Sequence, residues 1–193
     1  IDAITARADV LSVIAPPPPS TGGLSLMDAP ADWITAPSCR SVPVESDGPL
    51  QSAIARAEGG VDGTGITVGV ISDSFNVAEN VATTAADDVA LGALPGPGNP
   101  CGYETPVVVV SDATEGSDEG RAMAQLVHGI APGAQLLFAN GFPSAFVMAD
   151  NIRALVAAGA DIIVDDLSFY AEPIAQAGVL ADAIQEARDA GVA

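Results

Sequence analysis

This sequence has no lysine, one histidine and few aromatic residues. Its 6 basic residues are all arginines and face 25 acidic residues, so the formal net charge is -19. Binding to a nucleic-acid backbone or to an anionic membrane surface requires clustered positive charge, and the sequence contains no such cluster. No apolar run reaches the roughly 18 residues that a membrane span needs. We therefore expect no nucleic-acid partner and no membrane span.

Cysteine is also scarce, with only Cys39 and Cys101 present. There is no CxxC pair, and the single histidine, His128, lies far from both cysteines in sequence, so the spacing matches no zinc site. Whether the two cysteines form a disulfide is left open by the sequence. We expect no cofactor, and calcium binding is also left open.

The composition that remains is typical of one soluble domain. The 193 residues are 49% hydrophobic and only 4% aromatic, so the core must consist mainly of Ala, Val, Ile and Leu. The acidic excess favours a well-solvated surface and, with it, a secreted or cell-surface location. Residues 1–46 resemble an arm, with a short strand expected at 10–14 and a stiff polyproline run at 16–19. Residues 47–193 are expected to form the domain.

From residue 48 onward, short β-branched runs alternate with helical stretches, which predicts an α/β fold with a parallel sheet and helices on both faces. The expected strands cover residues 65–72, 106–111, 135–139 and 161–167. The expected helices cover residues 50–58, 81–91, 118–130, 147–158 and 175–190. Residues 192–193 are expected to begin another strand, so that the sequence stops within the fold.

Three aspartates follow predicted strands, where ligand-binding and catalytic groups collect in open parallel sheets. Asp73 follows the first strand, and Asp165 and Asp166 end the fourth. Each could instead be an ordinary turn-capping residue, but their common place at one sheet edge favours a shared site.

Glu119 opens the predicted helix 118–130, for which Ser117 is the expected N-cap. Helical spacing places Glu119 on one stripe with Met123, Leu126 and Ile130, and this stripe predicts that Glu119 faces inward. The alternative is a first-turn glutamate satisfied by the helix N-terminus.

His128 falls with Arg121 and Gln125 on the opposite, polar face of the same helix. A Ser-His-Asp triad needs the imidazole beside both partners, and this histidine points away from the acidic residues. We therefore expect it at the surface.

These motifs together resemble the subtilisin-like serine peptidases. The stretch 63–74 (GTGITVGVISDS) is similar to the family block whose aspartate orients the catalytic base, here Asp73. Glu119-Gly120 stands where the family's histidine motif begins, and residues 130–134 (IAPGA) are similar to its V-A-P-x-A block. The stretch 161–167 (DIIVDDL) resembles the substrate-binding strand, with Asp166 in place of serine. The resemblance covers residues 48–193.

The glutamate at the base position resembles the sedolisin-type peptidases, which share this fold and pair a glutamate with an aspartate and a serine. This resemblance implies Glu119 as base, Asp73 or Asp166 as its partner, and Asp165, Leu167 and Ser168 as substrate-binding residues. A carboxyl group beside a second carboxyl has a raised pKa and can exchange protons with a serine, so an acidic optimum is implied.

The family's oxyanion-asparagine block (A-G-N) and nucleophile block (G-T-S-x-A) are absent from these 193 residues. The resemblance therefore implies part of a secreted endopeptidase, acting on polypeptides together with the remainder of its catalytic domain and inactive alone. The stretch 10–19 resembles the tail of a propeptide.

Three other interpretations remain. The chain could be a non-catalytic scaffold or an adhesion module, since fold does not determine function. Asp73, Asp165 and Asp166 could hold a divalent cation, although a phosphoryl-transfer site would need a lysine. The first strand would also suit one half of a periplasmic-type binding protein.

Overall fold

The computed structural model describes residues 20–21, 39–173 and 176–193. The expected strand at 10–14, the polyproline run and the expected start of the last helix at residue 175 lie outside the described residues.

A four-stranded sheet forms the centre of the described structure, and all of its neighbouring strands are parallel. Its order is β3-β4-β2-β5. The strands are β2 (Thr67–Ser72), β3 (Val108–Ser111), β4 (Gln135–Asn140) and β5 (Ile162–Asp165). This is the predicted α/β sheet, with each strand within a few residues of its expected place.

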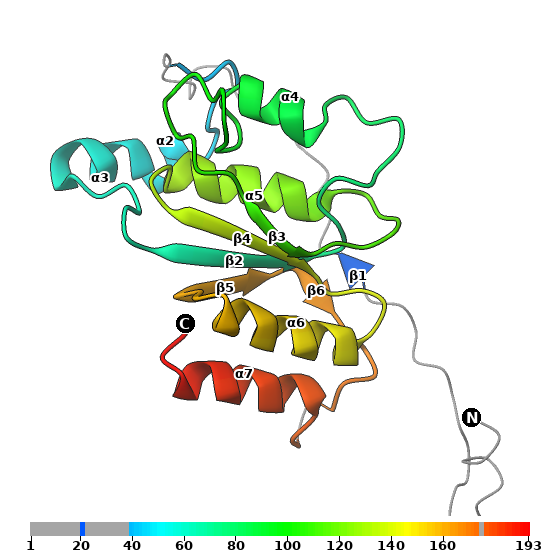
Figure 1. Ribbon diagram of the computed structural model, residues 1–193. Helices are drawn as coiled ribbons and strands as arrows, with labels where there is room; N and C mark the ends of the chain where they lie inside the picture. Colours follow the sequence, from blue (N-terminus) through cyan, green and yellow to red (C-terminus); the bar gives the residue numbers. More distant parts are fainter. Residues whose placement is uncertain (1–19, 22–38, 174–175) are drawn as a thin grey trace, which may run out of the picture.

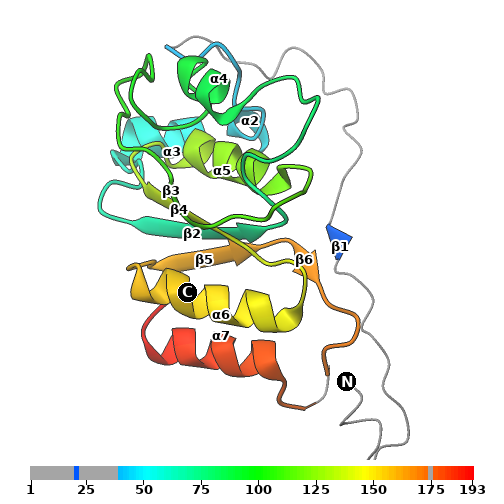
Figure 2. The ribbon, with the colours of Figure 1, turned by 45° about the vertical axis from the view of Figure 1, so that its right-hand side comes forward.

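Helices cover both faces of the sheet (Figures 1 and 2). One face carries α5 (Glu119–Ile130) with α4 (Ala85–Ala90) above it, and the short helices α2 (Asp47–Leu50) and α3 (Ser52–Gly59) lie on the same side. The other face carries α6 (Ala145–Ala157) and, below it, α7 (Val179–Asp189).

The alternation of side chains along the strands supplies one core to each face. On β2, Val68 and Val70 point toward α5 and join a cluster with Leu136 and Phe138 of β4. Ile71 points the other way, into the cluster built with α6 and α7. Because both faces of β2 and β4 are covered, these strands are nearly continuous apolar runs, as buried parallel strands require.

Several predicted elements differ from the structure in detail. The helix expected at 50–58 is divided into α2 and α3 by Gln51, whose φ of 54° interrupts it. The helix expected at 81–91 begins only at Ala85, where Thr84 forms a capping box with Asp87. The strand expected at 161–167 divides into β5 and β6 (Leu167–Ser168), and β6 pairs antiparallel with β1 (Ser20–Thr21).

Backbone hydrogen bonds join residue 193 to β5. The Ile163 N–H donates to the Ala193 carbonyl at 2.9 Å, and the Ala193 N–H donates to the Asp161 carbonyl at 3.0 Å. Cys39 and Cys101 form a disulfide, which answers the question that the sequence left open. No helix within the described ranges is long and apolar enough to cross a membrane.

Candidate active site

The candidate site lies at the carboxyl edge of the sheet, where the chain leaves neighbouring strands in opposite directions. After β2 the chain passes to α4, on the α5 side, whereas after β4 and β5 it passes to α6 and α7 on the other side (Figure 1). Such a switch point opens a crevice outside the carboxyl ends of the strands. Asp73 follows β2, Asp166 follows β5, and Glu119 begins α5.

Asp73 is buried and its carboxylate accepts four hydrogen bonds. Oδ2 accepts from the Ser117 amide at 2.5 Å and the Ser117 hydroxyl at 2.6 Å, while Oδ1 accepts from the Glu119 amide at 3.0 Å and the Ser74 hydroxyl at 3.2 Å. Burial raises the pKa of Asp73, but the bonds from Ser117, Ser74 and Glu119 outweigh it and hold the pKa below its ordinary value. Asp73 therefore stays ionised.

The loop before α5 also supplies acceptors to the loop after β2, so hydrogen bonds run in both directions between the two loops. Asp118 is buried, and its Oδ1 accepts from the Val77 and Ala78 amides at 2.8 and 3.1 Å. Asp112 accepts from the Phe75 and Asn76 amides at 3.0 and 3.2 Å. We call these two loops, residues 73–78 and 112–119, the carboxylate clasp. It fixes the start of α5 relative to the end of β2.

The start of α5 differs from the expectation at one residue. The N-cap is Asp118, with a φ of 60° and no side-chain capping bond, rather than Ser117. Ser117 is drawn away because both its amide and its hydroxyl donate to Asp73. The helix therefore begins at Glu119, whose amide is the third donor to that carboxylate from this loop.

Glu119 is half-buried, and its carboxylate accepts no hydrogen bond from the described residues. The stripe used to predict its inward direction is wrong, because Leu126 is 60% exposed and Ile130 is also exposed. The buried residues of α5 are instead Gly120, Arg121, Ala124, His128 and Gly129. Glu119 is partly covered because the helix begins at the sheet edge, not because of the stripe.

Asp166 is the carboxyl group in this site with a strongly raised pKa. Burial is the main cause, the charges of Glu119 and Asp73 add to it, and the Ser72 hydroxyl opposes it, so the pKa reaches about 6. Asp166 Oδ1 and the fully buried Ser72 Oγ have no partner that meets hydrogen-bond geometry in the described structure. The Glu119 charge raises the pKa of Asp166 more than the Asp73 charge does.

Neighbouring residues on β5 point to opposite faces, which separates Asp165 from Asp166. Val164 packs toward α5 and Ile163 toward α6 and α7, so the alternation places Asp166 on the α5 side with Glu119 and Asp165 on the other side. Burial raises the pKa of Asp165, partly offset by the Leu167 amide, but its side chain is largely exposed. Asp165 does not join the carboxyl group cluster.

The other two predicted substrate-binding residues form β6. Leu167 is buried, and a Cβ placed on Gly141 would come 2.2 Å from Leu167 Cδ1, so this side chain fills the core rather than facing a ligand. Ser168 is exposed. The backbone of both residues pairs with Ser20 and Thr21 in an antiparallel register, which shows that β6 can accept an extended segment.

The expectation of a surface histidine is wrong. His128 is 1% exposed, Arg121 is buried, and Gln125 is half-buried. The polar face of α5 is covered by α4 and by the chain around Arg40 and Tyr103. Arg121 lies between Asp88 and Asp118, at 3.5 and 3.2 Å, and Gln125 donates to Asp88 at 2.7 Å. The polar face of α5 is buried because Asp88 and Asp118, which lie outside the helix, pair with its polar side chains.

Sequence reasoning also missed residues that shape the site. Ser74 donates within the clasp and accepts the Asp118 amide at 2.8 Å. Asn140, buried at the end of β4, accepts from Ser111 at 2.6 Å and donates to the Phe142 carbonyl at 2.8 Å. The polar run Ser72-Asp73-Ser74 at the end of β2 was a signal, since short polar side chains after strands hydrogen-bond nearby amides.

In the described residues, no group of three or more His, Cys, Asp or Glu side chains is arranged to hold a metal ion. Asp73 already has four donors, and Asp165 and Asp166 lie on opposite faces, so these three do not form a ligand set. Chemically, the site offers one carboxylate held ionised, one carboxyl group whose pKa is about 6, and one half-buried glutamate at the start of α5. No family model matches the chain, and no curated protein matches it.

Proposed function

We propose that this chain is part of a secreted, subtilisin-like serine endopeptidase that uses carboxyl groups in place of the catalytic histidine. Glu119 acts as the general base, and Asp166 shares a proton with it. The observation that supports this most is the carboxyl group of Asp166 at the switch point of the sheet, whose pKa is raised to about 6 by burial and by the charge of Glu119.

The chemistry follows from the different environments of the carboxyl groups. Groups whose pKa values are driven apart can divide the acid and base roles, and here the pKa of Asp73 is lowered while that of Asp166 is raised. Asp73 orients the base through the backbone, because it accepts the Glu119 amide. Glu119 would take the proton of a serine hydroxyl and return it to the leaving amine, while Asp166 stabilises the protonated pair.

The neighbouring strand supports a polypeptide substrate. Extended peptides bind by adding a strand to an exposed sheet edge, where main-chain hydrogen bonds supply affinity. β6 follows Asp166 directly and pairs with the extended residues Ser20–Thr21. A substrate paired in the same manner would bring its backbone beside the carboxyl groups. The nucleophilic serine and the oxyanion donor would come from the remainder of the catalytic domain.

The test is a pH-rate profile of the parent peptidase with an unstructured peptide substrate. Wild-type activity should rise as the pH falls below neutral. Glu119→Gln keeps the size of the side chain but cannot accept the proton, so kcat should fall by about a hundredfold or more. Asp166→Asn should lower kcat and remove the limb of the profile near pH 6.

Glu115→Gln is the matched control, because this glutamate lies four residues earlier and is exposed. Its profile should equal that of the wild type. An alkaline optimum, or a Glu119→Gln variant with undiminished kcat, would reject the carboxylate base. The 193-residue chain alone should hydrolyse no peptide, since removing even one oxyanion donor typically costs about a hundred- to a thousandfold.

A non-catalytic scaffold is the second candidate. It is favoured by the complete use of Asp73 in the clasp, where all four donors are structural. On this hypothesis Asp73→Asn would reduce stability, whereas Glu119→Gln would alter no measurable activity.

A further inference from the structure

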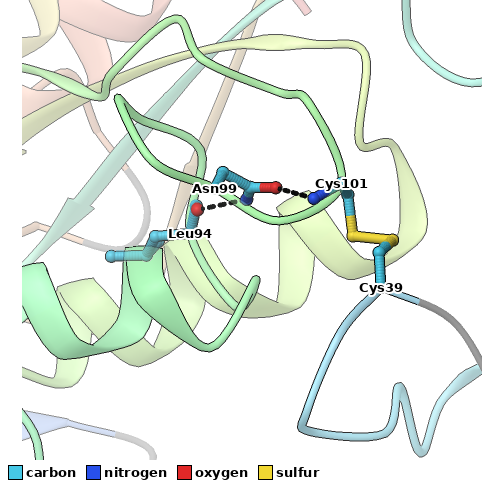
Figure 3. The surroundings of a disulfide bond; sticks show 4 residues. All are labelled: Cys39, Leu94, Asn99 and Cys101. Atoms are coloured by element: carbon cyan, nitrogen blue, oxygen red, sulfur yellow. Dashed lines mark hydrogen bonds between the residues drawn. A yellow bond between two sulfur atoms is a disulfide. The ribbon is translucent and has the colours of Figure 1, made fainter.

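Residues 39–46 cross the outer side of α5 and the loop after α4, and we call them the strap. The Cys39–Cys101 disulfide attaches one end, and Figure 3 shows that Cys101 is itself held by Asn99. The Asn99 Oδ1 accepts the Cys101 amide at 2.7 Å, and its amide group donates to the Leu94 carbonyl at 2.7 Å. The Ser41 amide donates to the Leu91 carbonyl at 2.8 Å.

Two glycines provide the space in which the strap lies. A Cβ on Gly129 would approach Val44 Cγ1 to 2.9 Å, and a Cβ on Gly92 would approach Arg40 Cα to 3.1 Å. The strap backbone and side chains therefore pack closely against α5 and the loop. Any change in the charge beneath them acts on a tightly fitted contact.

The other end of the strap is attached independently. Asp47, at the start of α2, pairs with Arg56 at 2.7 Å, and Arg56 donates to the Ile130 carbonyl at the end of α5 at 3.0 Å. Because both ends are attached, the strap can lift from α5 without leaving the domain.

His128 lies under the strap. Its ring meets Tyr103 edge-to-face at a centroid distance of 5.3 Å, and its Nδ1 is buried with no hydrogen-bond partner in the described structure. Burial lowers the pKa of His128 to about 4, and the positive charge of Arg40 contributes. Among the described residues, no carboxylate contributes to the pKa of this ring.

The charged and titratable groups around His128 come from every packed element. Arg40 comes from the strap and Tyr103 from the loop. Asp88 of α4 is engaged by Arg121 and Gln125 of α5. Asp47 and Arg56 act on Arg40 rather than on the imidazole. Arg40, the cation that lowers the pKa of His128, therefore belongs to the strap itself.

We propose that protonation of His128 lifts the strap from α5 in acid, while the disulfide and the Asp47–Arg56 pair keep both of its ends attached. The buried imidazolium would repel Arg40 and favour contact with water, and movement of the strap, which carries Arg40 and packs over α5, provides both. This inference does not depend on the proposed peptidase function.

Linkage sets the direction and the limit of the effect. The pKa of His128 is lowered in the closed state, so the open state, with an ordinary pKa of 6.5, binds more protons between pH 6.5 and about 4. The closed strap is therefore stabilised above pH 6.5 and loses that stabilisation as the pH falls to about 4. The two values allow the open-to-closed ratio to rise by at most about 300-fold.

Hydrogen–deuterium exchange with mass spectrometry on the intact, disulfide-bonded chain tests this proposal. A low protein concentration is needed because the sequence pI is about 4.1. After correction for intrinsic exchange, residues 39–46 should lose protection between pH 6.5 and 4, while residues 67–72 of β2 keep theirs. His128→Phe retains an apolar ring that cannot be protonated, so the strap should keep its protection at pH 4.

Loss of protection in both segments at the same pH would mean global unfolding and would overturn the proposal. Unchanged protection of residues 39–46 down to pH 4 would overturn it as well. If His128→Phe fails to fold, the comparison of the two wild-type segments still decides.

Discussion

Two aspartates in the candidate site, Asp73 and Asp166, have opposite relations to stability. Four hydrogen bonds offset the cost of burying the Asp73 carboxylate, so the pKa of Asp73 is lowered and its charged form stabilises the fold. That contribution is present above the unfolded pKa and is lost as the pH falls through the lowered folded pKa. Asp166 lacks such donors, and its pKa is raised to about 6. Its charged form destabilises the fold, and this penalty is fully present above pH 6, declines as the pH falls from about 6 toward the ordinary value of 3.8, and is absent below that value.

The same chemical change should therefore have opposite effects at the two positions. At pH 7, Asp73→Asn should lower the free energy of unfolding by about 2–4 kcal/mol, because it leaves charge-assisted donors facing an amide. Asp166→Asn should raise it by about 1 kcal/mol, after discounting for solvent screening at this half-exposed group. Urea denaturation at pH 7 measures both. Changes of the same sign in the free energy of unfolding for the two variants would contradict this assignment of the charges.

At the scale of the element, α5 packs closely against the sheet through a glycine and an alanine, Gly120 and Ala124. A Cβ on Gly120 would come 2.2 Å from Phe138 Cε2 and 2.8 Å from the Ser74 carbonyl oxygen. The helix therefore approaches β4 and the clasp by way of a glycine. Ala124 is completely buried one turn later. Small residues form the closest approach of α5 to the sheet, and Met123 and Val127 pack beside them against the same core cluster.

This packing explains which parts of the fold could be predicted from the sequence. β2 and β4 are continuous apolar runs between glycine or proline turns, so their places and the parallel sheet followed from pattern alone. The contact face of α5 did not, because Leu126 and Ile130 resemble a buried stripe while Gly120, Arg121 and His128 do not. A sequence window records no tertiary partner, and Asp88, Asp118 and Arg40 are what make the polar face of α5 an interior one.

The candidate site divides in the same way. Acids that follow strands could be placed at one sheet edge by topology, and this singled out Asp73, Asp165 and Asp166, whereas Glu119 was singled out by a helical stripe that the structure rejects. The separation of Asp165 from Asp166 required the register of β5, and the reciprocal bonds of Ser74 and Ser117 required the loop conformations. Side-chain direction at a strand end depends on a single residue of register.

Substitutions on two faces of α5 test the packing directly. Gly120→Ala should lower the free energy of unfolding by about 1–3 kcal/mol, because the new methyl group overlaps Phe138 and the Ser74 backbone. Leu126→Ala should change it by no more than about 0.5 kcal/mol, since this side chain is 60% exposed. Chemical denaturation of both variants provides the measurement. A large loss from Leu126→Ala would restore the stripe that the structure rejects.

On the scale of the whole molecule, the distribution of the few cations matters most. Among the arginines in the described residues, Arg121 is buried between two aspartates, and Arg56 and Arg153 pair with acids. The formal charge of -19 is therefore carried by a surface with little positive charge to balance it. Self-repulsion of this kind opposes the compact state, so covalent attachment of the strap adds stability where ion pairs add little.

The disulfide is accordingly expected to account for a substantial part of the stability. It links residues 62 apart in sequence, and closing a loop of that length in the unfolded chain corresponds to about 4 kcal/mol on the chain-entropy model. The double variant Cys39→Ala, Cys101→Ala should lower the free energy of unfolding by up to that amount at pH 7, where His128 is neutral and the strap remains closed. Urea denaturation of the oxidised wild type and the double variant measures the difference, and the wild type under reducing conditions is a second comparison that keeps both side chains.

Because the strap retains its second attachment through Asp47 and Arg56, β2 should keep its exchange protection in the double variant while residues 39–46 lose theirs. A double variant as stable as the oxidised wild type would show that covalent attachment of the strap does not stabilise the fold.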